Sequence, residues 1–345
     1  MRVLFYGESY LGTMGYSVVR ALTLLGHQVD VVDPSEYLTK KKLLGKYTVA
    51  LDRLLFLSIA RRINRRVLSL CVSKHDLVLV LKGLHLYPQT VLALRKSARW
   101  VVNYNQDDFF NPRRFAFHVW SPFLNDAFQL YDVIFTARKH VIEQYKKKGA
   151  RRVEYLPFSF DPEIFKPVSV SAADMGKLKS SVIFVGNWSR RREDAIKPLL
   201  NVTDVAIWGN SWRHSTSAFR AMTNCRVMGP TVQQDMSRLF NCSMICLNMY
   251  TPENNDHYTF RNFEISASGS FQLAERTPAA KEFFEEDTEC IYFGSPQELI
   301  AKTIHYLKEP VVRREVAIRG YVRAVNSKYT YQDRMSKMLR TLGLE

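Results

Sequence analysis

Long hydrophobic segments are missing from this sequence of 345 residues. No apolar run reaches the roughly 18 residues that a membrane-spanning helix needs. Residues 1–7 predict a strand and a turn, whereas a secretory signal peptide needs a longer apolar region and a small-residue cleavage site. We therefore expect a cytoplasmic chain, either free or attached peripherally to the inner face of the cytoplasmic membrane.

Cysteine is scarce and follows no metal-binding pattern. An odd count and the lack of a second pair near positions 242 and 246 exclude a disulfide framework and argue against a zinc site. We expect reduced, mostly buried thiols at all five positions, which are Cys71, Cys225, Cys242, Cys246 and Cys290.

A dinucleotide-binding fingerprint is also missing. Gly7, Gly12 and Gly15 follow the first apolar segment but do not make the G-x-G-x-x-G motif. Asp33 lies at the end of the next predicted strand, where NAD-binding proteins carry a ribose-binding acid. Without the glycine pattern we expect no NAD site, and no other cofactor is indicated.

Low-complexity stretches and short repeats are absent, and the composition, with 46% hydrophobic and 24% charged residues, is that of a globular protein. The length suits two domains. Short apolar strands alternate with helices, which predicts parallel sheets with right-handed crossovers. The expected strands are residues 2–6, 29–33, 76–81, 100–105, 131–136, 152–157, 181–186, 204–209 and 244–248, and the expected helices are residues 16–25, 51–70, 141–148, 297–307 and a last one reaching about residue 342.

The proline-punctuated run at residues 158–167 predicts an extended linker between two domains. A strand–helix pattern precedes it and a second one follows it. The sequence therefore predicts an α/β chain with one Rossmann-like domain on each side of the linker.

Positive charge is in excess and is distributed unevenly. The net charge is +16, of which residues 1–165, with 25 Lys+Arg and 14 Asp+Glu, contribute +11. Such an excess favours an acidic partner, such as anionic lipid, a phosphorylated glycan or nucleic acid, although scattered lysines also serve simple solvation.

Residues 51–70 predict a basic amphipathic helix. On a helical wheel the arginines gather on one face, and Leu57, Ile59, Ala60, Ile63, Val67 and Leu70 gather on the other. The helix is either an ordinary surface helix or an attachment site for an anionic membrane or acceptor. The basic residues are Arg61, Arg62, Arg65 and Arg66.

The most informative segment is residues 256–292. It predicts a helix that starts near a carboxylate, Glu264, and ends at a glycine, Gly269, before a short buried strand. The helix dipole favours an acid near a helix start, and the free N–H groups there can hold a phosphate. One element would then bind both a ribose and a diphosphate, which suits a nucleotide-sugar.

Four motifs lie in and just after this segment, R-x-F-E-I-x-A-x-G, L-x-E-R-T, F-F-E-E and Y-F-x-S-P-x-E-L, and they include Arg261, Phe263, Glu264, Ile265, Ala267, Gly269, Leu273, Glu275, Arg276, Thr277, Phe283, Phe284, Glu285, Glu286, Tyr292, Phe293, Ser295, Pro296, Glu298 and Leu299. Their combination resembles the C-terminal half of CgeB-like (spore-maturation-protein-like) glycosyltransferases. The resemblance implies the GT-B fold, in which two Rossmann-like domains face each other across a cleft. It also implies an enzyme that transfers sugars without metal.

The resemblance implies three parts of the chain with different tasks. Residues 1–160 would form the acceptor-binding domain and residues 161–328 the nucleotide-sugar-binding domain. Residues 329–345 would include a helix that returns to the N-terminal domain.

Donor-binding residues are expected at strand ends and around the predicted helix at Glu264. Glu264 would bind both ribose hydroxyls, while Arg261 would reach the diphosphate or pair with Glu264 or Asp256. Arg192 would stabilise the leaving diphosphate, although Arg190 or Arg191 could act instead. The other expected donor contacts are Gly12, Gly186, Asn187, Gly209, Asn210, Asp256, His257, Tyr258, Ser268 and Gly269, with Gly269 alternatively a helix cap.

The catalytic base, where an inverting reaction requires one, is expected in the N-terminal domain. Asp107 and Asp108 follow a predicted strand and are the candidates, with a turn or helix-cap role as the alternative. The two acids lack a third one for a metal site.

The sequence thus predicts a glycosyltransferase that moves a sugar from a UDP-, GDP- or dTDP-sugar to an acceptor hydroxyl on an anionic or membrane-borne glycan. Two alternatives remain: a glycosyltransferase of modified bases in nucleic acid, and an inactive GT-B partner that binds a glycan or protein.

Overall fold

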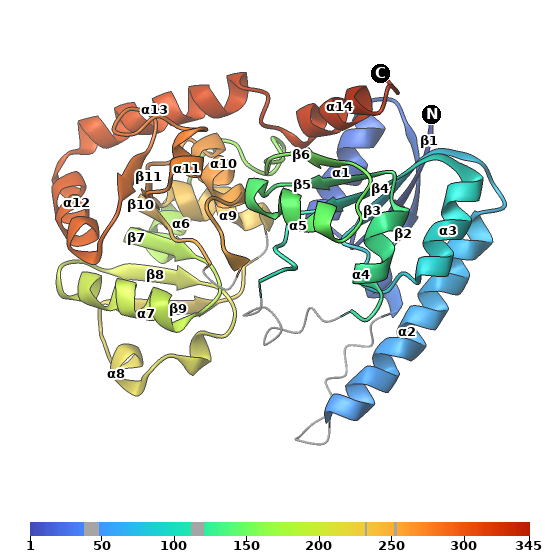
Figure 1. The fold of residues 1–345 in the computed structure, drawn as a ribbon. Coiled ribbons are helices and arrows are strands. Elements are labelled where there is room, and N and C mark those ends of the chain that lie inside the picture. The colour runs from blue at the N-terminus through green and yellow to red at the C-terminus, as the bar shows by residue number, and fades with distance from the viewer. Residues whose placement is uncertain (38–47, 112–120, 232, 252–253) are drawn as a thin grey trace. The chain divides into compact units, whose positions relative to one another are not determined.

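The computed structural model describes residues 1–37, 48–111, 121–231, 233–251 and 254–345, and omits the side chains of residues 48–55, 233 and 234. The chain forms two compact units (Figure 1). Unit 1 comprises Met1–Pro157 and Tyr331–Glu345, and unit 2 comprises Phe158–Thr330.

Unit 1 is built on a parallel six-stranded sheet with the order β2-β1-β3-β4-β5-β6. Its strands are β1 (Arg2–Tyr6), β2 (Gln28–Val32), β3 (His75–Leu81), β4 (Ala98–Asn105), β5 (Val133–Thr136) and β6 (Val153–Tyr155). Its helices are α1 (Met14–Leu24), α2 (Thr48–Leu70), α3 (Pro88–Ser97), α4 (Leu124–Ala127), α5 (Ile142–Lys147) and α14 (Tyr331–Thr341).

The central strands β1 and β3 each contain an unbroken buried apolar run, Val3–Tyr6 and Leu77–Leu81, because both faces of the sheet are covered. One face of the sheet packs against α1 and α14, in a cluster that includes Phe5, Leu79 and Met338. The other face packs against α2 and α3, in a cluster that includes Ile63 and Val91.

The last helix returns to unit 1, as the resemblance implied. Helix α14 contacts α1, and the side chains of Met335, Met338 and Leu339 are fully buried there. Residues separated by the whole of unit 2 thus complete one hydrophobic core.

Unit 2 repeats this plan with the sheet order β12-β11-β10-β7-β8-β9, again all parallel. Its strands are β7 (Ser180–Val185), β8 (Val205–Trp208), β9 (Cys225–Gly229), β10 (Ser243–Asn248), β11 (Gln272–Glu275) and β12 (Ile291–Phe293). Its helices are α6 (Ala172–Leu178), α7 (Arg190–Ile196), α8 (Ser217–Arg220), α9 (Gln233–Asn241), α10 (Phe260–Ala267), α11 (Pro278–Lys281), α12 (Pro296–Lys308) and α13 (Pro310–Asn326).

The run at residues 158–167 is part of unit 2 and not an exposed extended linker. Phe158, Phe160 and Phe165 are buried. The backbone N–H of Phe160 donates to the carbonyl of Tyr329 at 3.2 Å. The prolines led to the linker prediction, but the three phenylalanines between them need a core.

All five cysteines are free thiols, as expected from their spacing. Cys242, Cys246 and Cys290 are buried. Burial raises the pKa of the Cys225 thiol to about 11, so this thiol stays protonated at neutral pH.

The packing of α14 generates a stability prediction. Met338→Ala should lower the free energy of unfolding of unit 1 by about 2–4 kcal/mol, because it removes a fully buried side chain and leaves a cavity. Met175→Ala in α6 is the control, since Met175 is 38% exposed and should cost less than about 1 kcal/mol. Urea unfolding measures both, and equal losses would contradict the packing described here.

Candidate functional site

The sheet of unit 2 reverses its strand order between β7 and β10. In open α/β sheets, ligands bind at such a switch point, in the crevice outside the carboxyl ends of the strands. Three loops meet that edge: residues 186–189 after β7, residues 209–211 after β8, and the described residues 249–251 and 254–259 after β10. They carry most of the residues that the sequence predicted for donor binding.

The loops after β7 and β8 lie against each other. Trp188 N donates to the carbonyl of Asn210 at 2.9 Å, and Asn210 N donates to Oδ1 of Asn187 at 3.1 Å. At Gly209 an added Cβ would lie 2.0 Å from the carbonyl oxygen of Gly186. Glycine is therefore required at position 209 by the close approach of the two backbones.

Arg192 is buried and ties the loop after β7 to the loop after β10. Its guanidinium donates to the carbonyl oxygens of Asn187 and Met249 and to Oγ1 of Thr251, each at 2.9 Å. The guanidinium also lies over the ring of Phe184. The structure thus assigns Arg192 a role in holding the loops together, in addition to the leaving-group role that the sequence suggested.

Arg191 is the more accessible neighbour. Its side chain is 52% exposed and pairs with Glu275 at the end of β11. The guanidinium also donates to the carbonyl of Tyr250 at 3.3 Å, so it lies along the same strand-end edge. Arg190, by contrast, pairs with Asp194 along α7.

Asp256 shapes the loop after β10. Its carboxylate accepts from Thr251 N at 3.3 Å and from Nδ2 of Asn254 at 3.0 Å. Through Thr251 the loop is connected to Arg192. Hydrogen bonds therefore join Asp256, Arg192, Asn187 and Asn210 into one edge of unit 2.

His257 and Tyr258, which follow Asp256, differ in exposure. His257 is exposed, and its carbonyl accepts from the hydroxyl of Thr277. Tyr258 is buried, and its ring packs on those of Phe158 and Phe283, with centroids 5.2 and 4.7 Å away. The ring of Tyr258 therefore belongs to the core of unit 2.

Glu264 lies in the middle of its helix, not near the start. Helix α10 begins at Phe260 after the cap residue Thr259, so Glu264 is the fifth helical residue and the first turn contains no acid. The expectation that the helix dipole supports this acid was therefore wrong. The predicted free N–H groups are also partly used, because Thr259 and Asn262 form a capping box.

Arg261 and Glu264 form a nearly buried ion pair. Their side chains are 13% and 3% exposed. Burial raises the pKa of Glu264 to about 7, and Arg261 opposes that rise. The Arg261 guanidinium also contacts Sδ of Met236 and lies near the rings of Phe240 and Phe260.

Ser268 and Gly269 end α10. Ser268 is the C-cap, and its buried hydroxyl donates to the carbonyl of Glu264 at 2.8 Å. Gly269 has φ +67° and an added Cβ would meet Pro167 at 3.1 Å. The helix-cap alternative for Gly269 is therefore the role that the structure shows.

The predicted bases of unit 1 follow β4 and have different surroundings. Asp107 pairs with Lys82 at 2.8 Å. Asp108 is buried, accepts from the backbone N–H groups of Phe110 and Asn111, and lies 3.1 Å from Nε2 of His140. Although burial favours the neutral acid, the His140 and Phe110 hydrogen bonds hold the pKa of Asp108 below its usual value.

The sequence analysis missed Lys82 and His140. Lys82 follows β3 with φ +63°, a conformation that non-glycine residues seldom adopt. His140 follows β5 and is 24% exposed. Lys82 comes directly after a strand that the sequence predicted, and His140 lies four residues beyond the end of another, so their position near strand ends was the available signal.

The remaining predicted residues also have defined places. Gly12 lies in the loop between β1 and α1 with φ +92°. Asp33 accepts from Ser9 N at 2.8 Å and therefore fixes this same loop. On α2 the four arginines are exposed, and Leu57, which was expected on the apolar face, is 42% exposed on their side of the helix.

Two features are absent from the described residues, a membrane-spanning helix and a metal-binding cluster. No helix within them is long and apolar enough to cross a bilayer. The same residues contain no group of three or more His, Cys, Asp or Glu side chains that could hold a metal ion.

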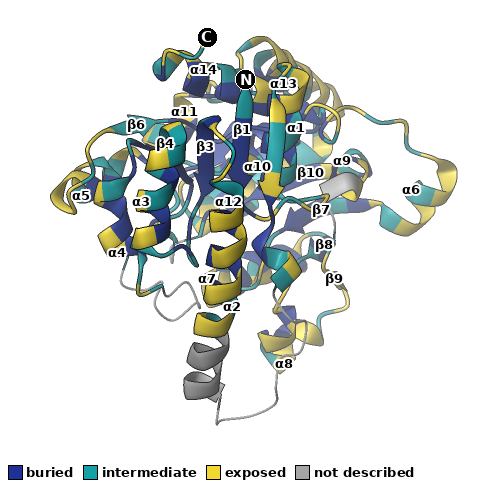
Figure 2. Cartoon of the chain, turned by 90° about the vertical axis from the view of Figure 1, so that its right-hand side faces the viewer, coloured by how far each residue is buried: buried dark blue, intermediate teal, exposed yellow. Residues whose placement is uncertain are grey.

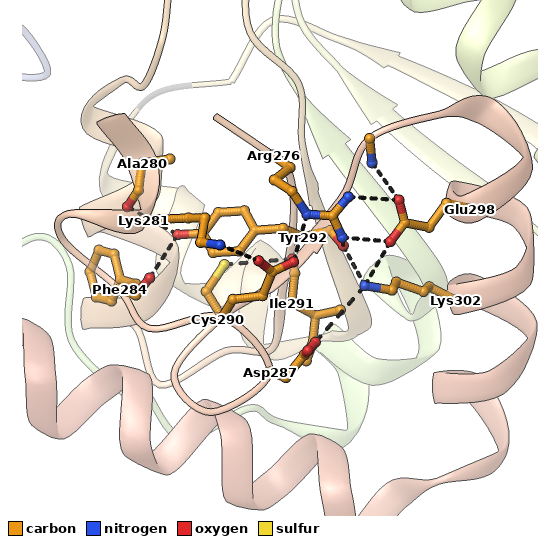
Figure 3. A network of polar contacts seen from close by, with 12 residues as sticks. Arg276, Ala280, Lys281, Phe284, Asp287, Cys290, Ile291, Tyr292, Glu298 and Lys302 are labelled. Atoms are coloured by element: carbon orange, nitrogen blue, oxygen red, sulfur yellow. Dashed lines mark hydrogen bonds and ion pairs between the residues drawn. The ribbon is translucent and has the colours of Figure 1, made fainter. Parts of the chain in front are cut away.

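Several of the motif residues form a structural ion-pair network (Figure 3). Arg276 makes two bonds to the Glu298 carboxylate, at 2.9 and 2.6 Å, and one to Glu286 at 2.6 Å. Lys302 pairs with Glu298 and Lys281 with Glu286. These contacts join the end of β11 to α12, so this part of the motif stabilises unit 2.

Comparison with known proteins supports the fold and one family. Residues 190–340 match the model of a family described as glycosyl transferase-like. No curated protein sequence matched the chain significantly.

Solved structures resemble the whole chain in fold. Sucrose-phosphate synthase from Thermosynechococcus elongatus has a TM-score of 0.67 at 10% identity, over 99% of both chains. Anabaena Alr3699/HepE, solved with UDP and glucose, has a TM-score of 0.63 at 13% identity, over 99% of both chains. A trehalose-6-phosphate synthase has a TM-score of 0.70 at 13% identity, over 100% of this chain and 99% of the other. The predicted GT-B fold is thus confirmed.

The ion-pair network predicts a pH-dependent contribution to stability. The hydrogen bonds from Arg276 lower the pKa of Glu298, so its carboxylate stabilises the fold above the unfolded pKa of 4.5. Glu298→Gln should cost about 1 kcal/mol at pH 7, and this difference should shrink as the pH falls below the unfolded value.

Urea unfolding from about pH 3 to about pH 7, the range in which carboxylates titrate, measures the difference in free energy of unfolding between wild type and Glu298→Gln. Glu285→Gln, at an exposed position in unit 2, is the control and should have little effect at any pH. A Glu298→Gln effect that is the same at both ends of the range would exclude the carboxylate charge as its cause.

Proposed function

We propose that the chain is a metal-independent glycosyltransferase of the CgeB-like group, which moves a sugar from a nucleoside diphosphate to an acceptor hydroxyl. The observation that carries the proposal is the pair Arg261–Glu264, a nearly buried acid and base inside the segment that matches the glycosyl transferase-like family. A buried ion pair is poor evidence for stability, because its desolvation offsets much of its attraction. A ligand-binding role explains its presence better.

In this proposal the ion pair between Glu264 and Arg261 opens when the donor binds, and each side chain then contacts a part of the donor. The two oxygens of Glu264 accept hydrogen bonds from the two ribose hydroxyls. The guanidinium of Arg261 turns to the diphosphate, whose charge it matches better than a lysine would. The pair is thus prepared for a ligand that offers hydroxyls and negative charge close together.

The strand-end edge of unit 2 would hold the rest of the donor. Arg192 holds its loops in place, and the exposed Arg191 would be the more accessible cation for a leaving diphosphate. A positioned guanidinium stabilises the charge that develops as the glycosidic bond to phosphate breaks. Asn187, Asn210 and Asp256 border this edge and would contact the base or the sugar.

Unit 1 would bind the acceptor. Asp107, paired with Lys82, and the hydrogen-bonded pair Asp108–His140 lie after neighbouring strands of one sheet. An inverting reaction would draw its base from these groups, and a retaining reaction would use them for binding. The anionic or membrane-borne glycan inferred from the charge remains the proposed acceptor.

Loss of the Glu264 carboxylate should weaken donor binding and donor hydrolysis. Glu264→Gln keeps the side-chain size but replaces one acceptor oxygen with a donor, so UDP should bind about 10- to 100-fold more weakly. Hydrolysis of UDP-, GDP- and dTDP-sugars should fall with it, while EDTA should leave the wild-type rate unchanged. UDP-glucose is the first donor to test, since a solved HepE complex contains it.

Calorimetry with UDP and a nucleotide-release assay measure these effects, and thermal unfolding verifies that the variant is folded. Glu285→Gln is the matched control in the same unit and should behave as wild type. Wild-type chain that neither binds nor hydrolyses any donor would reject the enzyme proposal and favour a binding protein. Unchanged UDP affinity in Glu264→Gln would reject the role of this residue.

Donor affinity should also depend on pH. The pKa of Glu264 is about 7, and only the carboxylate accepts both ribose hydroxyls, so affinity should fall about tenfold for each pH unit below 7. UDP itself titrates in this range, and Glu264→Gln therefore supplies the reference profile. Identical profiles for wild type and variant would show that Glu264 does not titrate with donor binding.

A further inference from the structure

The outward side of α2 is exposed in its described part (Figure 2), and it carries four arginines. The inward side is well buried, with Ala60, Ile63 and Val67 at most 1% exposed. We define the basic face of α2 as the exposed residues of its described part, which are Leu57, Ser58, Arg61, Arg62, Arg65, Arg66, Leu68 and Ser69.

The charge of this face is not neutralised within the described part of the chain. Residues 53–75 contain six Lys or Arg and no Asp or Glu. Among the described residues, no carboxylate forms an ion pair with the four arginines of the face. Arg62 lies over the ring of Tyr37, 5.5 Å from its centre, which leaves its charge uncompensated.

Apolar side chains are interspersed with these arginines. Leu57 and Leu68 are each 42% exposed, and at helical spacing they flank Arg61 on one stripe. Val72, just beyond the helix, is 89% exposed, and Leu92 on the neighbouring α3 is 44% exposed. A helix that only needs solvation does not require apolar groups on its charged side.

We propose that the basic face of α2 docks on an anionic lipid bilayer, so that the chain is a peripheral membrane protein. The arginines would contact lipid phosphates, while Leu57 and Leu68 enter the boundary between head groups and acyl chains. Nucleic acid would satisfy the arginines but would leave the leucines in water. The basic face of α2 therefore fits a bilayer better than it fits nucleic acid. This inference does not depend on the proposed transfer reaction.

Vesicle binding tests the proposal on the full chain. The wild type should sediment with vesicles of phosphatidylcholine and phosphatidylglycerol but not with phosphatidylcholine alone, and high salt should release it. Each arginine near an anionic surface contributes about a fivefold change in partitioning, so Arg61→Ala/Arg65→Ala should weaken binding about 30-fold. Lys147→Ala/Lys148→Ala, which alters exposed cations elsewhere on unit 1, is the control.

A second variant separates the bilayer from other anionic partners. Leu57→Ser/Leu68→Ser should weaken vesicle binding while leaving any binding to duplex DNA unchanged. The proposal is overturned if the wild type ignores anionic vesicles, if the lysine control loses as much affinity as the arginine variant, or if the leucine variant binds vesicles as wild type does. Thermal unfolding, measured in parallel, verifies that each variant is folded.

Discussion

The buried guanidinium of Arg192 is the constraint on which the strand-end edge of unit 2 depends. A buried cation needs hydrogen-bond acceptors for its N–H groups. The Arg192 guanidinium donates to two carbonyls and one hydroxyl, on loops that follow different strands. Those loops flank the switch point of the sheet, so satisfying Arg192 also fixes the edge at which a ligand would bind. Gly209 allows the third loop to approach the same edge.

The motif residues of unit 2 divide into two physical roles. Arg276, Glu286 and Glu298 are partly exposed, and the Arg276 guanidinium donates to both carboxylates and so joins secondary elements. Arg261 and Glu264 are nearly buried, and their pairing leaves Glu264 with a raised pKa. The Glu264 carboxylate loses hydration on burial, and Arg261 compensates only part of that loss. Such a group can gain hydrogen bonds from a ligand.

The two sides of α2 differ in character: one side is apolar and buried, and the other is basic and exposed. The buried side completes the core of the sheet, while the arginines and leucines of the outer side share one surface. If that surface docks on a bilayer, unit 1 would be held next to membrane-borne acceptors. Membrane attachment and the acceptor proposal would then have one common cause in the basic N-terminal half.

The sequence by itself determined the two parallel sheets and the amphipathic character of α2, because these follow from local hydrophobic periodicity. The return of the last helix was expected only from the family resemblance, since it is a contact between the two ends of the chain. It could not determine whether Arg192 or Arg191 is the exposed cation, where Glu264 lies along its helix, or that Asp108 would meet His140. The edge strand β9 was also missed, because its half-exposed residues make no apolar run. Such outcomes depend on contacts between residues distant in sequence, which fix burial and hydrogen-bond partners only when the tertiary structure forms.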